Sequence, residues 1–466
     1  MGGGISGLAC ARGILDQAPS TEVLVLEAGT EPGGPVRTER AEGFVCEVGP
    51  HGFLNADPSA LDLAKRLGLE DRLLFPDEAR RGRFIFLGGR LRAFPDRPLR
   101  FLTSDLLSVW GRARVLLEPL LPLDPPRGDE SVGAFARRRL GREAAERLID
   151  PLVCGIYGGD MDRLSLASST PQFAGLARRS RSLVVAAVRM VRAHASVAGG
   201  STRLHQRRLV SFVGGIGELV RGLVDSLGTV VECNAPVTGL ARHGGGWRVT
   251  IGGAHPRQLL ADTVISALPA PAARPLLGPL DPELARALGS IGFLPAAVVA
   301  LGLRREDVAH RLDGFGYLVP RAEGGSVLGV LWSSSMFPGH RSPEGTVLVQ
   351  AILGGARQPD ICEQSDAWLE EQVCGQLRRA IALRGAPVFR RIYRHRPGLP
   401  QYEVGHQARV AAVEAAELRL PGLFITGNAL RGIGINACTV DAGKLVTRVL
   451  GRLAQPNVPA AAAATA

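Results

Sequence analysis

The stretch Gly2-Gly3-Gly4-Ile5-Ser6-Gly7 fits the pattern G-x-G-x-x-G. In dinucleotide-binding folds such a turn joins a strand to a helix. Its glycines let the backbone approach a pyrophosphate, and the N–H groups at the helix start attract the phosphate charge. Val23-Leu24-Val25-Leu26 indicates a buried strand that ends in Glu27, an acid about 20 residues further on, where a ribose hydroxyl needs an acceptor. The pattern predicts nucleotide binding, and the alternative is a glycine-rich turn with no ligand.

The strand that should lead into this turn is not in the sequence, where only Met1 precedes Gly2. A sheet built around the turn needs that strand as its central member. We therefore expect the natural protein to begin several residues earlier, with an apolar strand.

Further glycine-rich stretches favour a flavin nucleotide. Gly33-Gly34-Pro35-Val36-Arg37-Thr38 follows the ribose acid, and its backbone can run along the phosphates and the ribityl chain. Gly49-Pro50-His51-Gly52 is well placed to approach a flavin ring. His51 is a candidate catalytic base, although a single histidine in a Gly-Pro turn is more often positional. A third turn, at 432–436, precedes a helix expected from Thr439 to Leu453 and also suits a phosphate or a flavin edge.

The composition is that of a globular protein with two or three domains. Of the 466 residues, 45% are hydrophobic and 21% are charged. No stretch reaches the roughly 18 uninterrupted apolar residues of a membrane span, and no secretory signal is visible. The seven cysteines lack metal-binding spacing, so we expect buried free thiols, a reducing compartment and no metal site.

The net charge of +11 is concentrated in one part of the chain. Residues 163–217 hold nine arginines and no acid, with an apolar run at 183–188 between them. A basic helix with an apolar face suits the surface of an anionic membrane. The alternatives are a solvated helix whose arginines pair with acids elsewhere and, more weakly, nucleic-acid binding without the usual aromatic residues.

Elsewhere, hydrophobic periodicity gives the main elements. We expect an amphipathic helix at 59–69, a hairpin at 80–91 and one continuous helix at 135–149. The stretch from Phe212 to Leu219 is expected to begin another helix. Arg83, at the start of the hairpin, is either a rim charge or a clamp for a carboxylate.

More specific motifs lie further along the chain. They are DPLVCGIYGGD at 150–160, GGIGEL at 214–219, GFGYLVP at 314–320, PQYEVGH at 400–406 and GIGINAC at 432–438. With this set, the sequence resembles the flavin amine-oxidase superfamily and, within it, the oxygen-dependent protoporphyrinogen oxidase family, over about Gly2 to Gly451.

The resemblance implies an α/β fold, with a Rossmann-like FAD-binding domain, an inserted α+β substrate domain and a helical membrane-associating domain. The FAD-binding domain is expected in three parts, at 1–90, 211–275 and 396–455. The helical, basic domain is expected at 91–210, the substrate-binding domain at 276–395 and a disordered tail at 456–466.

The resemblance also implies the reaction and its participants. FAD accepts a hydride from protoporphyrinogen IX in each of three two-electron steps, and O2 takes the electrons onward as hydrogen peroxide, with no certain catalytic side chain. Arg83 would bind a propionate of the substrate, and Phe315, Gly316, Leu318 and Ile352 would hold the macrocycle. The implied FAD contacts are Gly2, Gly3, Gly4, Ile5, Ser6, Gly7, Glu27, Ala28, Pro35, Gly49, Pro50, His51, Gly52, Val237, Asn428, Ile433, Gly434 and Ile435. Pro35, His51 and Asn428 are not the family's commonest residues there.

The implied location is the cytoplasm, with peripheral contact with the cytoplasmic membrane and no nucleic-acid partner; a homodimer is compatible with the resemblance. Three alternatives remain. A related oxidase would act on coproporphyrinogen III, whose four propionates call for more cations. An amine oxidase often keeps a lysine beside the flavin, and this chain has only Lys65 and Lys444, on a helix surface and on the last helix. A degenerate flavoprotein would only bind a membrane or a partner.

Overall fold

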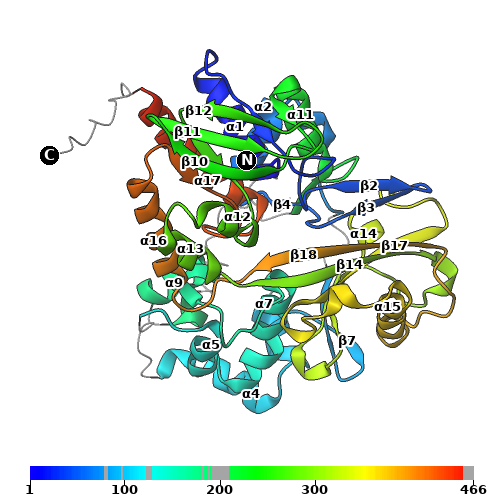
Figure 1. Cartoon of the computed structure of the whole chain (residues 1–466). Helices are drawn as coiled ribbons and strands as arrows, with labels where there is room; N and C mark the ends of the chain where they lie inside the picture. The colour runs from blue at the N-terminus through cyan, green and yellow to red at the C-terminus, as the bar shows by residue number, and fades with distance from the viewer. Residues whose placement is uncertain are drawn as a thin grey trace.

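The computed structural model describes residues 1–77, 82–95, 98–121, 128–180, 182–186, 189 and 209–454. Its largest sheet has seven strands (Figure 1). In order these are β18 (Phe389–Pro400), β14 (Phe293–Arg304), β17 (Thr346–Gly354), β16 (Val327–Leu331), β15 (Gly314–Leu318), β6 (Gly82–Leu87) and β7 (Arg90–Ala93). Neighbouring strands run antiparallel except β15 and β6, which are parallel.

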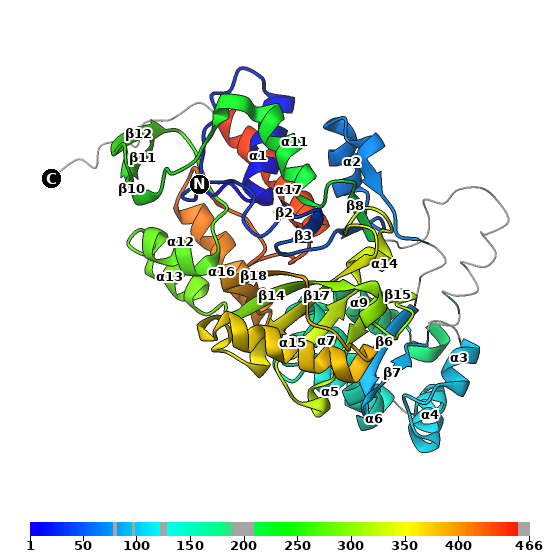
Figure 2. The same cartoon turned by 90° about the vertical axis from the view of Figure 1, so that its right-hand side faces the viewer.

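The two faces of this sheet are covered differently. Helix α15 (Asp366–Ile381) covers one face, where Leu369 and Val373 belong to the same apolar cluster as Val299 (Figure 2). On the other face, Leu348 packs against Phe44 of β3 (Phe44–Glu47). The sheet therefore separates an ordinary hydrophobic core from the part of the molecule that contains the N-terminal glycine-rich turn.

That second part is built from the two ends of the chain. Helix α1 (Ile5–Gln17) and helix α17 (Ile435–Leu453) lie side by side through small and apolar residues, among them Cys10, Ala442 and Val446 (Figure 2). Two parallel strand pairs accompany them, β1 (Val25–Leu26) with β9 (Val231–Glu232) and β13 (Val264–Ser266) with β19 (Leu423–Ile425).

Shorter elements surround these strands. They are β2 (Thr38–Ala41), β4 (Phe53–Leu54), α2 (Ser59–Arg66), β5 (Leu73–Leu74), β8 (Leu209–Phe212), α11 (Gly217–Leu227), β10 (Val237–His243), β11 (Gly246–Ile251), β12 (Arg257–Ala261), α12 (Ala270–Leu277), α13 (Pro282–Gly289), α14 (Ser333–Met336) and α16 (His406–Arg419). Strands β10, β11 and β12 form a separate antiparallel sheet above α12 and α13 (Figure 1).

The third part of the molecule is helical. It contains α3 (Pro98–Thr103), α4 (Val109–Leu116), α5 (Val132–Leu140), α6 (Arg142–Ala144), α7 (Asp150–Tyr157), α8 (Leu166–Ser169) and α9 (Pro171–Arg179). The fully buried Arg139 lies 2.8 Å from Glu118, whose carboxylate also accepts the Leu183 N–H. Through Glu118, α5 is thus joined both to the segment that follows α4 and to the segment around Leu183 that follows α9.

The structure corrects three element boundaries. The continuous helix predicted at 135–149 is wrong, because Gly141 has φ +87° and ends α5; a separate helical segment covers 142–149. The C-terminal helix begins at Ile435 rather than Thr439. The stretch at 212–219 begins as the end of strand β8, and its helix starts at Gly217.

Several other predictions can be compared with the structure. The cysteines are all free and six are buried, as predicted. Strands β6 and β7 join the seven-stranded sheet, so the boundary predicted at 90 falls inside a hairpin of that sheet. Much of the basic stretch at 163–217 and the tail at 456–466 lie outside the described residues. None of the described helices combines the length and the apolar character needed to cross a lipid bilayer.

Candidate active site

The glycine-rich turn leaves the start of α1 open to a ligand. Gly4 is the N-cap residue, with φ −73° and ψ 174°, and no side chain caps the helix. The first turn has no acidic residue, and a Cβ atom placed on Gly4 would meet nothing within 4 Å. The first N–H groups of a helix lack partners within it and carry partial positive charge. This end of α1 is therefore suited to an anion such as a phosphate.

A second helix begins at the same place. Helix α17 starts at Ile435 after the N-cap Gly434, again with no capping side chain and no acid in its first turn. Ile5 and Ile435 belong to one apolar cluster, so the two helix N-termini lie close together. The structure thus brings Ile433, Gly434 and Ile435 to the Gly2–Gly7 turn, although 426 or more residues of chain separate them.

Glu27 lies against the glycine-rich turn and accepts backbone hydrogen bonds there. Its Oε2 accepts the Gly3 N–H at 2.7 Å, and its Oε1 accepts the Gly29 N–H at 2.8 Å. Each oxygen of a carboxylate has a further lone pair, so a ribose hydroxyl can still be bound. Gly33 also contacts the glycine-rich turn, because its N–H donates to the Gly3 carbonyl at 2.7 Å.

Three more predicted contacts lie at the ends of strands around this turn. Ala28 follows β1 and is exposed, and Asn428 follows β19 and is half-buried. The Asn428 carbonyl accepts the Tyr402 hydroxyl at 2.5 Å. Val237 begins β10 and is half-buried. Ligands of open α/β sheets bind at the carboxyl ends of parallel strands, which is where Ala28 and Asn428 lie.

The 49–52 turn packs on the exposed Pro35, because a Cβ atom on Gly49 would come within 2.6 Å of the Pro35 carbonyl oxygen. Within this turn, His51 is buried, and its Nε2 has no hydrogen-bond partner in the part of the chain that the structure describes. Burial, together with the charge of Arg341, lowers the pKa of His51 to about 4. The ring is therefore neutral at neutral pH, with one nitrogen able to bond to a ligand.

A buried polar group beside this turn was not recognisable from the sequence. Glu47 accepts hydrogen bonds from Thr38 Oγ1 at 2.6 Å and the Ile216 N–H at 3.0 Å, and it lies 3.9 Å from the Arg341 guanidinium. Burial raises the pKa of Glu47 to about 7, although Arg341 opposes this. Gln350 Nε2 donates to the Glu47 carbonyl at 2.8 Å. The only sequence signal was a glutamine inside the apolar strand 346–354.

Gln350 lies between the 49–52 turn and the residues of the sheet that are predicted to contact the substrate. Ile352 lies two residues further along β17 and faces the same side of the sheet. Leu318 of β15 and Ile352 both pair with Gly329 of β16, so they form one row across the sheet. Both side chains are half-buried, which leaves them accessible on the face that looks toward the 49–52 turn.

Arg83 and Phe315 lie beside this row, which continues from Leu318 to Ile85 of β6. Arg83 pairs with Gly316, two residues before Leu318, and its guanidinium lies 5.4 Å from the centre of the Phe315 ring. Its side chain is exposed and makes no ion pair with any described residue. Gly316 has φ +134°, and a Cβ atom there would lie 2.0 Å from the Val330 carbonyl oxygen, so only glycine fits. The structure places Leu318 and Ile352 on one face of the sheet and Arg83 in the neighbouring row, in contact with Phe315.

The model of the family described as flavin containing amine oxidoreductase matches residues 5–449. The chain belongs to this family. A coproporphyrinogen III oxidase of Bacillus subtilis (strain 168) is 31% identical over 95% of this chain and 95% of its own length. A chloroplastic protoporphyrinogen oxidase of Oryza sativa subsp. japonica is 32% identical over 96% of this chain and 87% of its own length. A solved structure from Exiguobacterium sp. 255-15, provisionally named a protoporphyrinogen oxidase, has a TM-score of 0.83 at 26% identity, covering 97% of this chain and 98% of that one.

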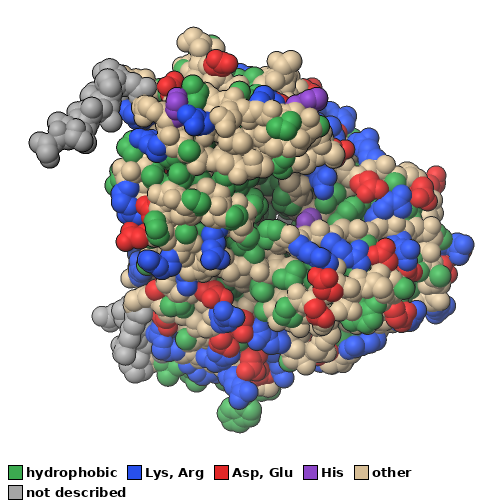
Figure 3. Space-filling model, viewed as in Figure 1, with side chains coloured by type: hydrophobic (Ala, Val, Ile, Leu, Met, Phe, Trp, Pro, Cys, Tyr) green, Lys and Arg blue, Asp and Glu red, His purple; other side chains and the backbone are tan. Residues whose placement is uncertain are grey.

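As a flavin-containing amine oxidoreductase, this protein is an FAD-dependent enzyme, and its residues fit that cofactor. The open N-termini of α1 and α17 suit the pyrophosphate, and Glu27 suits the ribose. The unpartnered Nε2 of His51 is available for a polar edge of the flavin. When bound, the flavin supplies hydride acceptance, and the protein has to place the substrate against it. Figure 3 shows a hollow in the surface between the β10–β12 side of the molecule and the strands β14 and β18.

Proposed function

We propose that this enzyme oxidises a porphyrinogen to the conjugated porphyrin, with O2 as the electron acceptor. For protoporphyrinogen IX, six electrons and six protons leave the macrocycle in three two-electron steps, and three O2 become three hydrogen peroxide. The observation that carries the proposal is the apolar row of Leu318 and Ile352 with the unpaired Arg83 at its edge. A porphyrinogen is a large apolar ring with carboxylates on its rim, and this face offers the complementary surface.

The residues have separate tasks in this scheme. Arg83 binds a propionate, because a planar guanidinium can meet both oxygens of a carboxylate. The ring of Phe315 beneath it holds the guanidinium in place through a cation–π contact. Leu318 and Ile352 bury one side of the macrocycle and exclude water from it. The flat backbone at Gly316 allows the ring to lie close to the sheet.

No described side chain is required to remove the protons. His51 is neutral, and its lowered pKa makes it a weak base. Glu47 is fully buried and already bonded to Thr38 and to the Ile216 N–H. The gain of conjugation in the oxidised macrocycle drives the loss of its protons to solvent.

Protoporphyrinogen IX is the substrate that one cation at the rim favours, because it carries two propionates. Coproporphyrinogen III, with four, is the second candidate, favoured by the 31% identity to the Bacillus subtilis enzyme of that name. Anaerobic mixing of the holoenzyme with each porphyrinogen tests both, since substrate oxidation bleaches the flavin absorbance. Faster bleaching by one of them identifies the substrate, and bleaching by neither refutes the proposal.

We also propose that the helical part rests on a membrane surface through α4 and the turn after it. The side chains of Trp110, Leu120 and Val109 are 84%, 78% and 68% exposed. Hydrophobic side chains protrude at the lower end of Figure 3, where Figure 1 places α4. An exposed tryptophan among aliphatic residues suits a lipid interface, and the positive charge of the chain favours anionic lipid. This surface lies within the helical domain predicted at 91–210 but outside its most basic stretch.

A further inference from the structure

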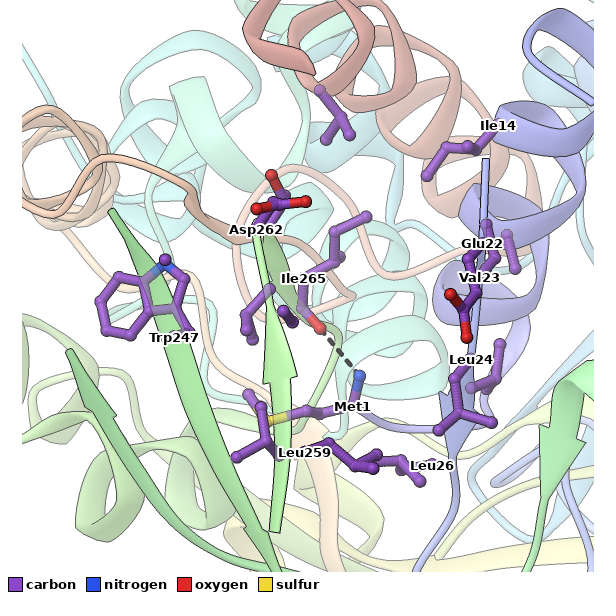
Figure 4. Close-up of a pocket in the computed structure, with 18 of the residues that line it drawn as sticks. Met1, Ile14, Glu22, Val23, Leu24, Leu26, Trp247, Leu259, Asp262 and Ile265 are labelled. Atoms are coloured by element: carbon purple, nitrogen blue, oxygen red, sulfur yellow. Dashed lines mark hydrogen bonds between the residues drawn. The ribbon is translucent and has the colours of Figure 1, made fainter. Parts of the chain in front are cut away.

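The loop that follows β19 carries two of the proposed flavin contacts, Asn428 and Ile433. Within the described residues, β19 pairs with β13 alone. The other edge of β13 borders a cavity of about 750 Å³, where the Met1 amine bonds to that strand (Figure 4). The strand pair ends at Ile425, so contacts beyond the sheet must hold the loop in place.

Tyr402 provides such contacts from a separate segment of the chain. Its hydroxyl donates to the Asn428 carbonyl at 2.5 Å and accepts the Gly432 N–H at 2.8 Å. The side chain is buried, and burial raises the pKa of the hydroxyl well above its ordinary value, so the hydroxyl stays protonated and able to donate. One side-chain oxygen thus joins the start of the loop to its end.

A histidine supports Tyr402 in this position. The rings of Tyr402 and His406 are stacked, with their centres 4.0 Å apart and their planes at 19° or less, namely 18°. The Nε2 of His406 bonds to the Leu430 carbonyl at 2.8 Å. Together the two side chains bind the loop at residues 428, 430 and 432, in each case through its backbone.

The backbone around Tyr402 is bonded to the helical part of the molecule. The Tyr402 carbonyl accepts the Ser165 N–H at 2.8 Å and the Ser169 hydroxyl at 3.3 Å. Two residues further on, the Val404 N–H donates to the Arg163 carbonyl at 2.9 Å. The same short segment therefore contacts the helical part with its backbone and the flavin loop with its side chain.

Two acidic side chains reinforce the connection to the helical part. Glu403 lies 2.8 Å from the Arg163 guanidinium. One oxygen of Asp129 accepts the Gly405 N–H at 2.7 Å, and its other oxygen accepts the Ser165 hydroxyl. The segment 402–405 is thus fixed to residues from before α5 and from before α8.

We propose that Tyr402 is a positioning residue that couples the helical part to the flavin-contacting loop at 428–433. A displacement of the helical part moves the loop, and FAD bound at the loop restrains the helical part in return, because coupling between two sites is reciprocal. The proposal rests on the proposed flavin contacts of Asn428 and Ile433, and it is independent of which porphyrinogen is the substrate.

Tyr402→Phe tests the coupling, because it removes both bonds of the hydroxyl and keeps the aromatic ring. Tyr157→Phe is the matched control, since Tyr157 lies in the same apolar cluster and its hydroxyl donates to the Ser169 carbonyl, outside the loop. Hydrogen exchange of the Ser165 and Gly432 amides is measured for the original protein and both variants, without and with FAD. Calorimetric titration gives the Kd for FAD.

In the original protein and in Tyr157→Phe, FAD should slow the exchange of the Ser165 amide at least about fivefold, although this amide belongs to the helical part. In Tyr402→Phe this response should fall below about twofold, and the Kd for FAD should rise at least about fivefold through the loss of two hydrogen bonds to the loop. A purely structural role would lower the Tm and leave the response of the Ser165 amide to FAD intact.

The two amides distinguish the ways in which the proposal can fail. FAD that alters neither amide refutes the flavin contacts of the loop, and the coupling with them. FAD that slows only the Gly432 amide in the original protein refutes the coupling alone, and so does a full Ser165 response in Tyr402→Phe. Porphyrinogen takes no part in these measurements, so a failure of the proposed substrate is seen only in the bleaching experiment.

Asp129→Ala provides the same test from the helical side if Tyr402→Phe does not fold. It removes the acceptor of the Gly405 N–H and leaves both loop contacts of Tyr402 in place. FAD should still slow the Gly432 amide in this variant, and its effect on the Ser165 amide should decrease. An undiminished Ser165 response in Asp129→Ala overturns the proposal.

Discussion

Replacing Gly4 by alanine should weaken FAD binding while leaving the stability of the apoprotein almost unchanged. Gly4 has backbone angles that alanine adopts readily, and the new methyl group meets no protein atom within 4 Å. Restricting the unfolded chain gains up to about 1 kcal/mol, and alanine is a poorer N-cap than glycine by a similar amount. We therefore expect the Tm of the apoprotein to change by no more than about 4 °C.

The affinity for FAD should change much more than the Tm. A phosphate oxygen bonds to a helix N–H at about 2.9 Å, whereas it must stay about 3.5 Å from a methyl carbon. The methyl group of G4A therefore displaces the pyrophosphate and removes at least one hydrogen bond to a charged group, which is worth about 1.5–3 kcal/mol. The Kd for FAD should rise between about tenfold and 150-fold.

Calorimetric titration of the apoprotein with FAD measures this effect, and a thermal melt of the same sample measures stability. Gly7→Ala is the matched control, because its Cβ atom would lie 2.1 Å from the Gly2 carbonyl oxygen and so should damage the fold itself. An FAD affinity of G4A within twofold of the original would refute the assignment of this turn to the pyrophosphate. A fall in the Tm of the apoprotein by more than about 10 °C would refute the packing argument.

Other substitutions test the rest of the site. Glu27→Ala removes the acceptor for Gly3 and Gly29 and should weaken FAD binding at least about tenfold in the same titration; equal affinity would exclude a ribose contact. Arg83→Ala should raise KM for the porphyrinogen at least about tenfold with little change in Tm, whereas Arg90→Ala on the same hairpin should not change KM; equal effects of the two would refute the clamp. The pKa of His51 is about 4 in the folded protein against an ordinary 6.5, so only the unfolded chain gains a proton as pH falls from 7 to 5. This difference should lower the free energy of unfolding by about 2 kcal/mol between the two pH values. Denaturant titrations at pH 7 and pH 5 should show this loss in the original protein and not in His51→Gln. Trp110→Ser should reduce sedimentation with anionic vesicles without changing FAD content, and unchanged sedimentation would refute the proposed membrane surface.

Local patterns in the sequence were sufficient to predict the elements that we propose bind the nucleotide. The Gly2–Gly7 turn, the strand ending in Glu27 and the turn at 432–436 are recognisable because each needs particular residues at short spacing. The structure places them around one point, as ligand binding by all three requires. The resemblance to a family added Arg83 and the wall of Leu318 and Ile352, whose common face depends on strand pairing.

Other features depend on contacts between distant parts of the chain. In the sequence, Arg341 resembles an ordinary surface cation, and Gln350 is a single polar residue in an apolar strand. Only the fold shows that both are buried beside Glu47. The parallel pairing of β6 with β15 joins segments more than 200 residues apart, so no local pattern indicates it. The break at Gly141 was missed because hydrophobic periodicity continues across it while the backbone does not.

The joining of α1 with α17 also constrains how the enzyme is made. Helix α17 covers Ile435–Leu453, so the last helix that the structure describes would supply half of the proposed anion-binding end of the site. During synthesis the first helix leaves the ribosome long before its partner exists. A nascent chain that still lacks α17 cannot present both proposed anion-binding helix ends to FAD. We expect a truncation that removes α17 to impair FAD loading even where the other parts of the protein fold.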